Sequence, residues 1–361
     1  MRRLPIPLAL ALLLVAAAPA SADATRSLKG TLSPGASQAW AVENLAGTMK
    51  VVAGSGSAVT ATVTVHAESD ELASLLKVEE VSGKDGVRTL RVVYPMDKHT
   101  TYRYSPKGGS ESWLGGLFGG DTTLEYAGRH VKVSGSKGVK LYADVEVRVP
   151  PSLGQGTLRN HVGRLQADGL EGKLRFDSAS GDVDLSNLRG TIGADTGSGD
   201  VKIADVHGSL DCDTGSGDIS VERFEGDVLR VDVGSGDIKV RAGAVTKVDL
   251  DSGSGDLSIK TTETEEFLAD TGSGDLVVDL GGSRLRRVKA STGSGDVTLR
   301  LGPDASFEAH VDQGSGDMDN RFTDAKPLVK GREVIGYTRG DGRTKIDIET
   351  GSGDFTLEPG S

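Results

Sequence analysis

The tetrapeptide Gly-Ser-Gly-Asp recurs through the second half of the chain and constrains the fold more than any other feature. The copies are Gly197–Asp200, Gly215–Asp218, Gly234–Asp237, Gly253–Asp256, Gly272–Asp275, Gly293–Asp296, Gly314–Asp317 and Gly351–Asp354. A shortened copy ends at Asp182, and from there the closing aspartates lie 18, 18, 19, 19, 19, 21, 21 and 37 residues apart. A nearly fixed period of this length is typical of a solenoid, in which each repeat stacks on the one before. The sequence therefore predicts an all-β fold, a single-stranded parallel β-solenoid (β-helix) with about 19 residues per coil.

Alternating apolar residues flank each tetrapeptide, which we call a corner. Val201-Lys202-Ile203 follows one corner, and the pair Leu210 and Cys212 precedes the next. Alternation with a period of two indicates a strand with one buried face. We therefore predict two strands meeting at each corner, with the remaining six to nine residues closing the coil. The predicted inward pairs are Ile192/Ala194, Leu210/Cys212, Leu229/Val231, Val248/Leu250, Phe267/Ala269, Val288/Ala290 and Ile346/Ile348.

The glycines of the corner have a mechanical reason. Corners stacked about 4.8 Å apart leave little room for side chains and require a positive φ. A weaker corner is predicted at Val162–Arg164, and Ala53–Ser57 resembles a degenerate one. The 37-residue gap corresponds to two coils in sequence order, with the missing corner predicted at Gly336–Asp341 and displaced by an insertion at residues 324–333.

Two columns of aspartates run through the repeats, one closing each corner and one five residues earlier. Stacked carboxylates repel one another, so the repulsion must be offset either by bound calcium or by hydrogen bonds to the carboxylates. In the second explanation each side chain accepts hydrogen bonds from the backbone N–H groups of its own turn. The spacing departs from that of calcium-binding nonapeptide β-rolls, because here the aspartate directly follows the second glycine. The calcium candidates are Asp195, Asp200, Asp213, Asp218, Asp232, Asp237, Asp251, Asp256, Asp270 and Asp275.

The amino-terminal part of the chain has other features. Residues 1–22 combine two arginines, a short apolar run and a small-residue cleavage site, which predicts a signal peptide and export. We expect residues 23–150 to be an irregular β region or first coils with a glycine-rich loop at 105–121, residues 151–358 to be regular repeats, and residues 359–361 to be a tail. The loop holds four large apolar residues that either contact a partner or cover the open side of the solenoid. They are Trp113, Leu114, Leu117 and Phe118.

Charge and motif content exclude some classes of function. A net charge of −11 disfavours nucleic-acid binding, which needs clustered Lys and Arg. The six histidines lack metal-ligand spacing, and no nucleophile-elbow or phosphate-binding motif is present. Catalytic carboxylates are singular and environmentally distinct, whereas these acids repeat identically. We therefore expect a protein that is not an enzyme, binds no cofactor other than the calcium considered above, and has no transmembrane segment once the signal peptide is removed.

The repeats resemble a known family. The run Leu141–Pro150, the many Thr-Gly-Ser-Gly-Asp-apolar-x-apolar units and the closing run Gly340–Leu357 look like the bacterial putative-adhesin β-strand-repeat family. That resemblance covers about residues 40–358 and implies an exported solenoid, periplasmic or at the cell surface. It implies an interaction module of the cell envelope whose partner is a protein or a glycan. The alternatives are a calcium-stabilised structural rod and a polysaccharide-active β-helix enzyme.

Overall fold

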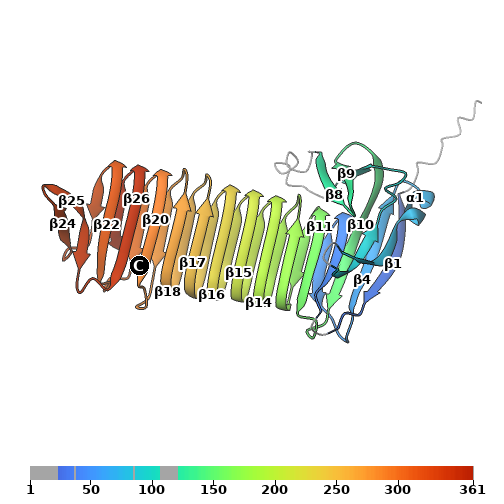
Figure 1. The fold of residues 1–361 in the computed structure, drawn as a ribbon, viewed down its shortest axis with the longest axis horizontal. Helices are drawn as coiled ribbons and strands as arrows, with labels where there is room; N and C mark the ends of the chain where they lie inside the picture. The colour runs from blue at the N-terminus through green and yellow to red at the C-terminus, as the bar shows by residue number, and fades with distance from the viewer. Residues whose placement is uncertain (1–22, 36–37, 84–85, 106–120, 361) are drawn as a thin grey trace, which may run out of the picture.

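The computed structural model describes residues 23–35, 38–83, 86–105 and 121–360. Within them the fold is all-β, with a long, mostly parallel sheet that does not close on itself (Figure 1). The all-β prediction is confirmed. The predicted signal peptide, residues 1–22, and the four apolar residues of the glycine-rich loop lie outside the described residues.

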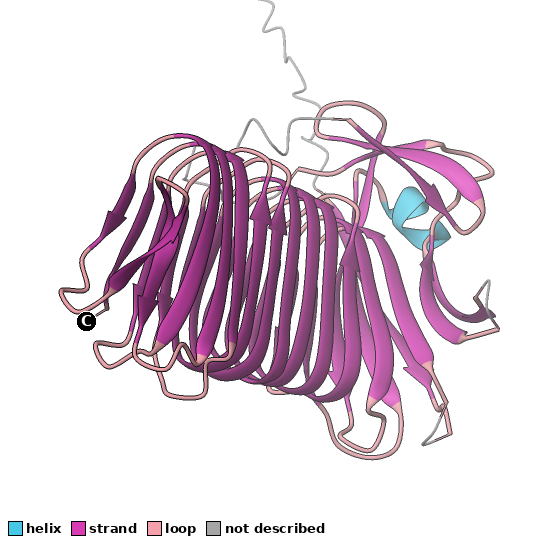
Figure 2. Ribbon diagram, turned by 60° about the vertical axis from the view of Figure 1, so that its left-hand side comes forward, coloured by secondary structure: helices cyan, strands magenta, loops and turns pink. Residues whose placement is uncertain are grey.

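The regular repeats form bent strands that each run from one corner to the next. They are β14 (Val183–Ser198), β15 (Val201–Ser216), β16 (Ile219–Ser235), β17 (Ile238–Ser252) and β18 (Leu257–Thr271). Each strand pairs in parallel with the next, so that Val183 lies beside Val201 and Val201 beside Ile219. The two strands expected per repeat are thus one continuous strand that curves between corners, as the ribs in Figure 2 show. The next repeat is split into β19 (Leu276–Leu280) and β20 (Arg287–Ser294), and β21 (Val297–Leu301) follows.

The two halves of each bent strand belong to two faces with the core between them. The first half of β14 pairs with β12, and its second half pairs with β13. What we call the post-corner face continues from β14 through β12 (Leu165–Asp168), β3 (Met49–Ala53), β10 (Val139–Val149), β4 (Val59–Ala67) and β1 (Ala24–Leu32). The pre-corner face continues through β13 (Glu171–Ser178), β11 (Gln155–Val162), β2 (Trp40–Ala46), β6 (Arg88–Val93) and β5 (Lys77–Ser82).

A small second layer covers the amino-terminal end. It contains β7 (Thr101–Arg103), β8 (Thr122–Tyr126) and β9 (Arg129–Ser134), together with helix α1 (Asp70–Leu75). The helix begins after Ser69, whose hydroxyl accepts the Leu72 N–H, as expected of an N-cap. Tyr126 from β8 packs into the core and is fully buried. These elements cover strand edges and apolar core that the end of the sheet would otherwise expose.

The predicted core and corner geometry are confirmed. All fourteen residues of the seven inward pairs are buried. At a representative corner, Gly217 has φ +134°, and a Cβ there would lie 2.3 Å from the carbonyl oxygen of Gly199 in the preceding repeat. The early corner at Gly163 is also present, with φ +108°. The first corner of the stack is at Gly47, between β2 and β3, so assigning a corner to Ala53–Ser57 was wrong.

The carboxyl-terminal repeats do not stack in sequence order. The elements are β22 (Phe307–Ser315), β23 (Met318–Asn320), β24 (Lys326–Lys330), β25 (Glu333–Arg339), β26 (Thr344–Ser352) and β27 (Phe355–Pro359). Strand β26 lies between β20 and β22, and β27 lies between β21 and β23, in parallel with all four. The corner predicted at Gly336–Asp341 was wrong, because Gly336 belongs to β25, which is antiparallel to β22 and forms a hairpin with β24.

Polar residues at inward positions explain this order. Gln313 stands where most other repeats have a buried threonine, and Asn320 stands where they have Leu, Ile or Val. Gln313 donates to the carbonyl of Gly316, and Asn320 donates to that of Phe322, and both are only half-buried. Strands β26 and β27, which lie between the other repeats, instead have apolar inward residues, and these are buried. They are Ile346, Ile348, Phe355 and Leu357. The repeat with polar inward residues is therefore the terminal one, because burying those groups under another repeat would cost free energy.

Candidate functional site

The corner aspartates form a ladder that links neighbouring repeats. The N–H of Asp237 donates to Oδ1 of Asp218 at 2.9 Å, and the N–H of Asp256 donates to Oδ1 of Asp237 at 2.9 Å. The same bond joins every consecutive pair of corners in the stack, from Asp182 to Asp317. In the hydrogen-bonding explanation each carboxylate was placed on the N–H groups of its own turn, and this detail was wrong for the corner aspartates. All of them except Asp317, the last in the stack, accept instead from the N–H of the corner stacked on them.

The second aspartate column lies in register on the outside of the pre-corner face. Asp195, Asp213, Asp232, Asp251 and Asp270 pair successively along the stack. Burial, and then the charge of the neighbouring aspartates, raises the pKa of Asp213 and that of Asp251 above the ordinary range. In the part of the chain that the structure describes, no group of three or more His, Cys, Asp or Glu side chains could hold a metal ion. The calcium hypothesis for the ten aspartates therefore gains no support from their geometry.

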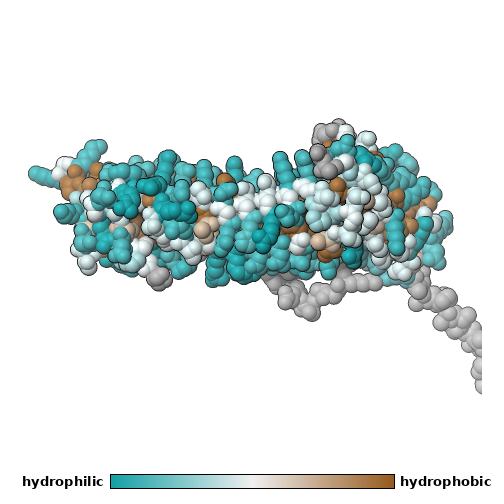
Figure 3. Space-filling model, turned by 90° about the horizontal axis from the view of Figure 1, so that it is seen from below, coloured by the Kyte–Doolittle hydropathy of each residue, from teal (hydrophilic) through white to brown (hydrophobic). Residues whose placement is uncertain are grey.

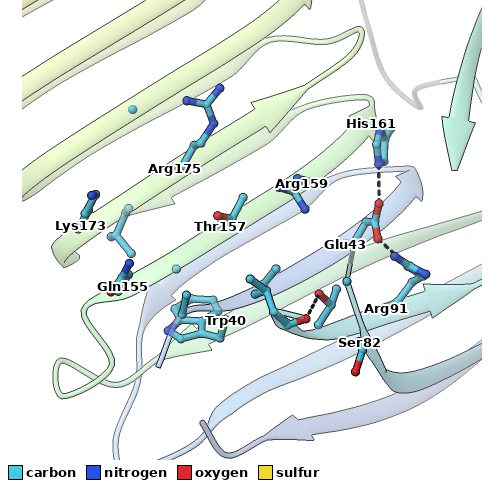
Figure 4. A pocket seen from close by; sticks show the side chains of 18 of the residues that line it. Trp40, Glu43, Ser82, Arg91, Gln155, Thr157, Arg159, His161, Lys173 and Arg175 are labelled. Atoms are coloured by element: carbon cyan, nitrogen blue, oxygen red, sulfur yellow. Dashed lines mark hydrogen bonds and ion pairs between the residues drawn. The ribbon is translucent and has the colours of Figure 1, made fainter. Parts of the chain in front are cut away.

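A groove of about 840 Å³ lies near the amino-terminal end of the pre-corner face. Strands β2, β6, β11, β13 and β14 contribute its floor, and the turn between β8 and β9 contributes a wall. The close-up in Figure 4 shows the labelled side chains around it. We call it the junction groove, because it lies where the regular repeats meet the amino-terminal strands. Its lining combines charged groups with the hydroxyls of Thr157, Thr191 and Ser82.

Two residue choices shape the floor of the junction groove. The indole of Trp40 is buried, and its N–H donates to the carbonyl oxygen of Leu153 at 3.0 Å. A Cβ at Gly156 would lie 2.2 Å from the Trp40 ring, so only glycine leaves room for the indole. Gly193 opens the other side, since its nearest neighbour to a Cβ is Cγ of Arg175 at 3.7 Å. The two glycines thus seat the indole and keep the groove hollow.

An ion cluster around the buried Glu43 lies at one end of the groove. Glu43 accepts from Nε of Arg91 at 2.5 Å and lies 3.0 Å from Nε2 of His161 (dashed lines in Figure 4). Burial alone would raise the pKa of Glu43, but the hydrogen bonds and charges of His161 and Arg91 lower it on balance. Arg91 also lies over the ring of Tyr126 at 5.9 Å. A carboxylate shared between two bases is held ionised, so this cluster is a fixed feature of the groove.

A row of cationic side chains continues from this cluster across the groove. Arg159 pairs with Asp177 at 3.1 Å, and Arg175 bridges Asp177 at 2.7 Å and Asp195 at 2.8 Å. Lys173, also exposed, has no ion-pair partner among the described residues. Beyond β14 the same face carries the aspartate column. The groove therefore carries cationic and acidic side chains side by side, and Arg91, Arg159 and Arg175 are all paired with carboxylates.

Outside the junction groove, the described surface shows one exposed hydrophobic patch. The view in Figure 3 is hydrophilic over most of its length, with a hydrophobic patch at the end formed by β24 and β25. In that hairpin Val329 is 57% exposed and Val334 is 41% exposed. Cys212 is buried, as predicted for an inward residue, and burial raises the pKa of its thiol. No described helix has both the length and the apolar character needed to cross a membrane.

Comparison with known proteins places the chain in a family. Two overlapping segments, residues 60–223 and 192–358, match the model of the Toastrack DUF4097 family. The chain belongs to the Toastrack family. The resemblance to a putative-adhesin repeat family of unknown function is thereby confirmed. No curated protein matches the sequence.

Several solved structures match this Toastrack chain at low identity. A putative lipid binding protein from Parabacteroides distasonis is 10% identical, with a TM-score of 0.41, and the match covers 92% of this chain and 96% of that one. A putative adhesin from the same organism is 12% identical, with a TM-score of 0.38 and coverage of 91% and 97%. A putative cell adhesion protein from Clostridium sporogenes is 10% identical, with a TM-score of 0.22 and coverage of 93% and 100%. These likenesses are too distant to carry an argument about function.

The junction groove was missed by sequence reasoning. Trp40, Glu43 and Arg91 come from strands that are far from the regular repeats along the chain, and no short motif joins them. One local feature of the sequence could have indicated the groove. Lys173 and Arg175 occupy outward positions of a strand, whereas the following repeats place aspartates on the same face.

Proposed function

We propose that this chain is a non-enzymatic, exported, adhesin-like interaction module of the cell envelope, in the periplasm or at the surface. In this proposal residues 151–358 form a β-solenoid of about 19 residues per coil. Residues 23–150 form its amino-terminal β region, and residues 1–22 are a signal peptide. The junction groove holds the partner, which is an extended polar chain such as a glycan strand or a peptide segment.

The observation that carries this proposal is the junction groove itself. Gly156 and Gly193 leave it open, and it is lined by hydroxyls and by charged groups of both signs. Extended polar ligands are held by several such groups spaced along a surface. Strand-borne side chains are held rigidly, so the site needs little ordering when it binds.

A non-enzymatic role is supported by the way the carboxylates are used. The corner aspartates are occupied in backbone hydrogen bonds between repeats. The carboxylate of Glu43 is shared between Arg91 and His161, which lower its pKa. A general acid needs a raised pKa, whereas the pKa of this group is lowered.

Filling the groove tests the proposal without assuming the ligand's charge. Gly193 has room for a side chain and no positive φ, so Gly193→Trp should fold normally and block the groove. Asp249 occupies the equivalent outward position three repeats further on, outside the groove, so Asp249→Trp is the matched control. Binding to arrays of envelope glycans and of peptides should fall at least tenfold for Gly193→Trp alone. Equal binding by wild type and both variants would assign the contact to another surface.

A further inference from the structure

The carboxyl-terminal segment holds the last repeat onto the molecule. Among the described residues, β22 pairs only with β25 and β26, and β23 pairs only with β27. Residues 302–339 are therefore joined to the rest of the sheet through residues 344–359. The gap that this segment fills, between β20/β21 and β22/β23, is called the strand slot below. It is visible in Figure 1, where β26 lies between β20 and β22.

The strand slot recognises a motif rather than a unique sequence. The N–H of Asp354 donates to Oδ1 of Asp296 at 2.8 Å, and the N–H of Asp317 donates to Oδ1 of Asp354 at 2.8 Å. A Cβ at Gly353 would lie 2.0 Å from the carbonyl oxygen of Gly295, so the slot accepts only a glycine corner. These are the contacts made between all consecutive repeats. Any strand carrying the corner and inward apolar residues can satisfy them.

The connection into the slot is short and crosses over a strand. Strand β25 pairs with one edge of β22 and β26 pairs with the other, so the chain passes over the end of β22 within residues 340–343. Gly340 and Gly342 have φ of +66° and +65° there. The crossing is fixed at Ser306, whose carbonyl oxygen accepts from the N–H of Thr344 at 3.0 Å. Short crossing connections favour exchange of the segment that follows them between molecules.

We infer that residues 344–359 are an exchangeable donor strand, and that the strand slot of one molecule takes this segment from a second copy. The exchange is reciprocal, so it gives a closed dimer in which the two copies meet through their carboxyl-terminal ends. Every contact of the segment is the same in both forms, and only residues 340–343 change conformation. The exposed Val329 and Val334 belong to β24 and β25, which lie at this same end of the molecule (Figure 1), and they become a surface on which the two copies pack.

Isotope mixing tests the exchange on the full chain. Nitrogen-14 and nitrogen-15 preparations are mixed, taken to the midpoint of denaturation, returned to native buffer and analysed by size-exclusion chromatography and native mass spectrometry. Dimers of mixed mass are expected, in a fraction that rises with protein concentration and persists for hours after tenfold dilution. Only monomers, at all concentrations up to about 1 mM, would overturn the inference.

A hinge deletion shows whether the exchange uses this slot. Removing Asp341 and Gly342 leaves too short a connection to cross β22 within one molecule, but an exchanged strand does not need to cross. The dimer fraction should rise at least fivefold. Removing Ser55 and Gly56, from the exposed loop between β3 and β4 at the other end of the molecule, is the matched control and should leave the wild-type fraction. Equal dimer fractions in the two deletions would contradict exchange through the strand slot.

Discussion

A single methyl group at a corner glycine should disrupt the stack. Gly236 has φ +150°, and a Cβ there would lie 2.2 Å from the carbonyl oxygen of Gly217 and 2.7 Å from its carbonyl carbon. Ordinary contacts of this kind are longer by about 1 Å, so the two repeats must separate locally. The backbone strain of a non-glycine residue costs roughly 1–3 kcal/mol, and weakening the corner hydrogen bond from Gly236 to Ser254 costs about 1 kcal/mol more. We expect Gly236→Ala to lower the free energy of unfolding by about 3 kcal/mol.

Chemical denaturation followed by circular dichroism measures this change. Gly193→Ala is the matched control, because its backbone is unstrained and the nearest atom to the new Cβ is 3.7 Å away. The control should lie within about 0.5 kcal/mol of wild type or be slightly more stable. If Gly236→Ala unfolds at the same denaturant concentration as Gly193→Ala, close backbone approach does not explain the glycines of the corner.

Two further predictions concern the aspartates. Asp237→Ala removes the acceptor for the Asp256 N–H and should lower the free energy of unfolding by about 1 kcal/mol, and an unchanged melting temperature would contradict the ladder's role. Asp213→Asn removes a carboxylate from the outer column and should stabilise the protein at pH 7 by about 0.5 kcal/mol. The pKa of Asp213 is raised in the folded state, so its cost to stability appears as pH rises through that pKa. The advantage of the variant should therefore vanish in acid, and an advantage that persists at low pH would refute the electrostatic explanation.

Much of the repeat could be read from the sequence because its signals are local. Alternation with a period of two identifies the inward residues within a few positions, and all of the predicted inward pairs are buried. The glycines identify the corners because a tight backbone approach excludes every other residue type. These constraints act within one repeat or between identical neighbours. They do not depend on where in the molecule the repeat lies.

The order of the last repeats could not be read from spacing, because all corners carry the same motif and each can stack on any other. The prediction that the 37-residue gap holds two coils in sequence order assumed that each corner stacks on the one before it in the chain. A local signal was present in Gln313 and Asn320, whose polar side chains mark an end repeat. This signal can be interpreted only once the structure shows that β26 and β27 lie between β20/β21 and β22/β23.

The sequence by itself determined the all-β class, the period, the corner glycines and the composition of the core. The tertiary structure decided which repeat neighbours which, and which N–H each aspartate accepts. It also created the junction groove from Trp40, Glu43 and Arg91, which are distant in sequence from Lys173 and Arg175. The physical reason is that periodicity reports which face of a strand is buried. Which repeat lies next to which depends instead on pairing between strands that are distant in sequence. Every repeat carries the same corner motif, so the motif alone does not select one partner.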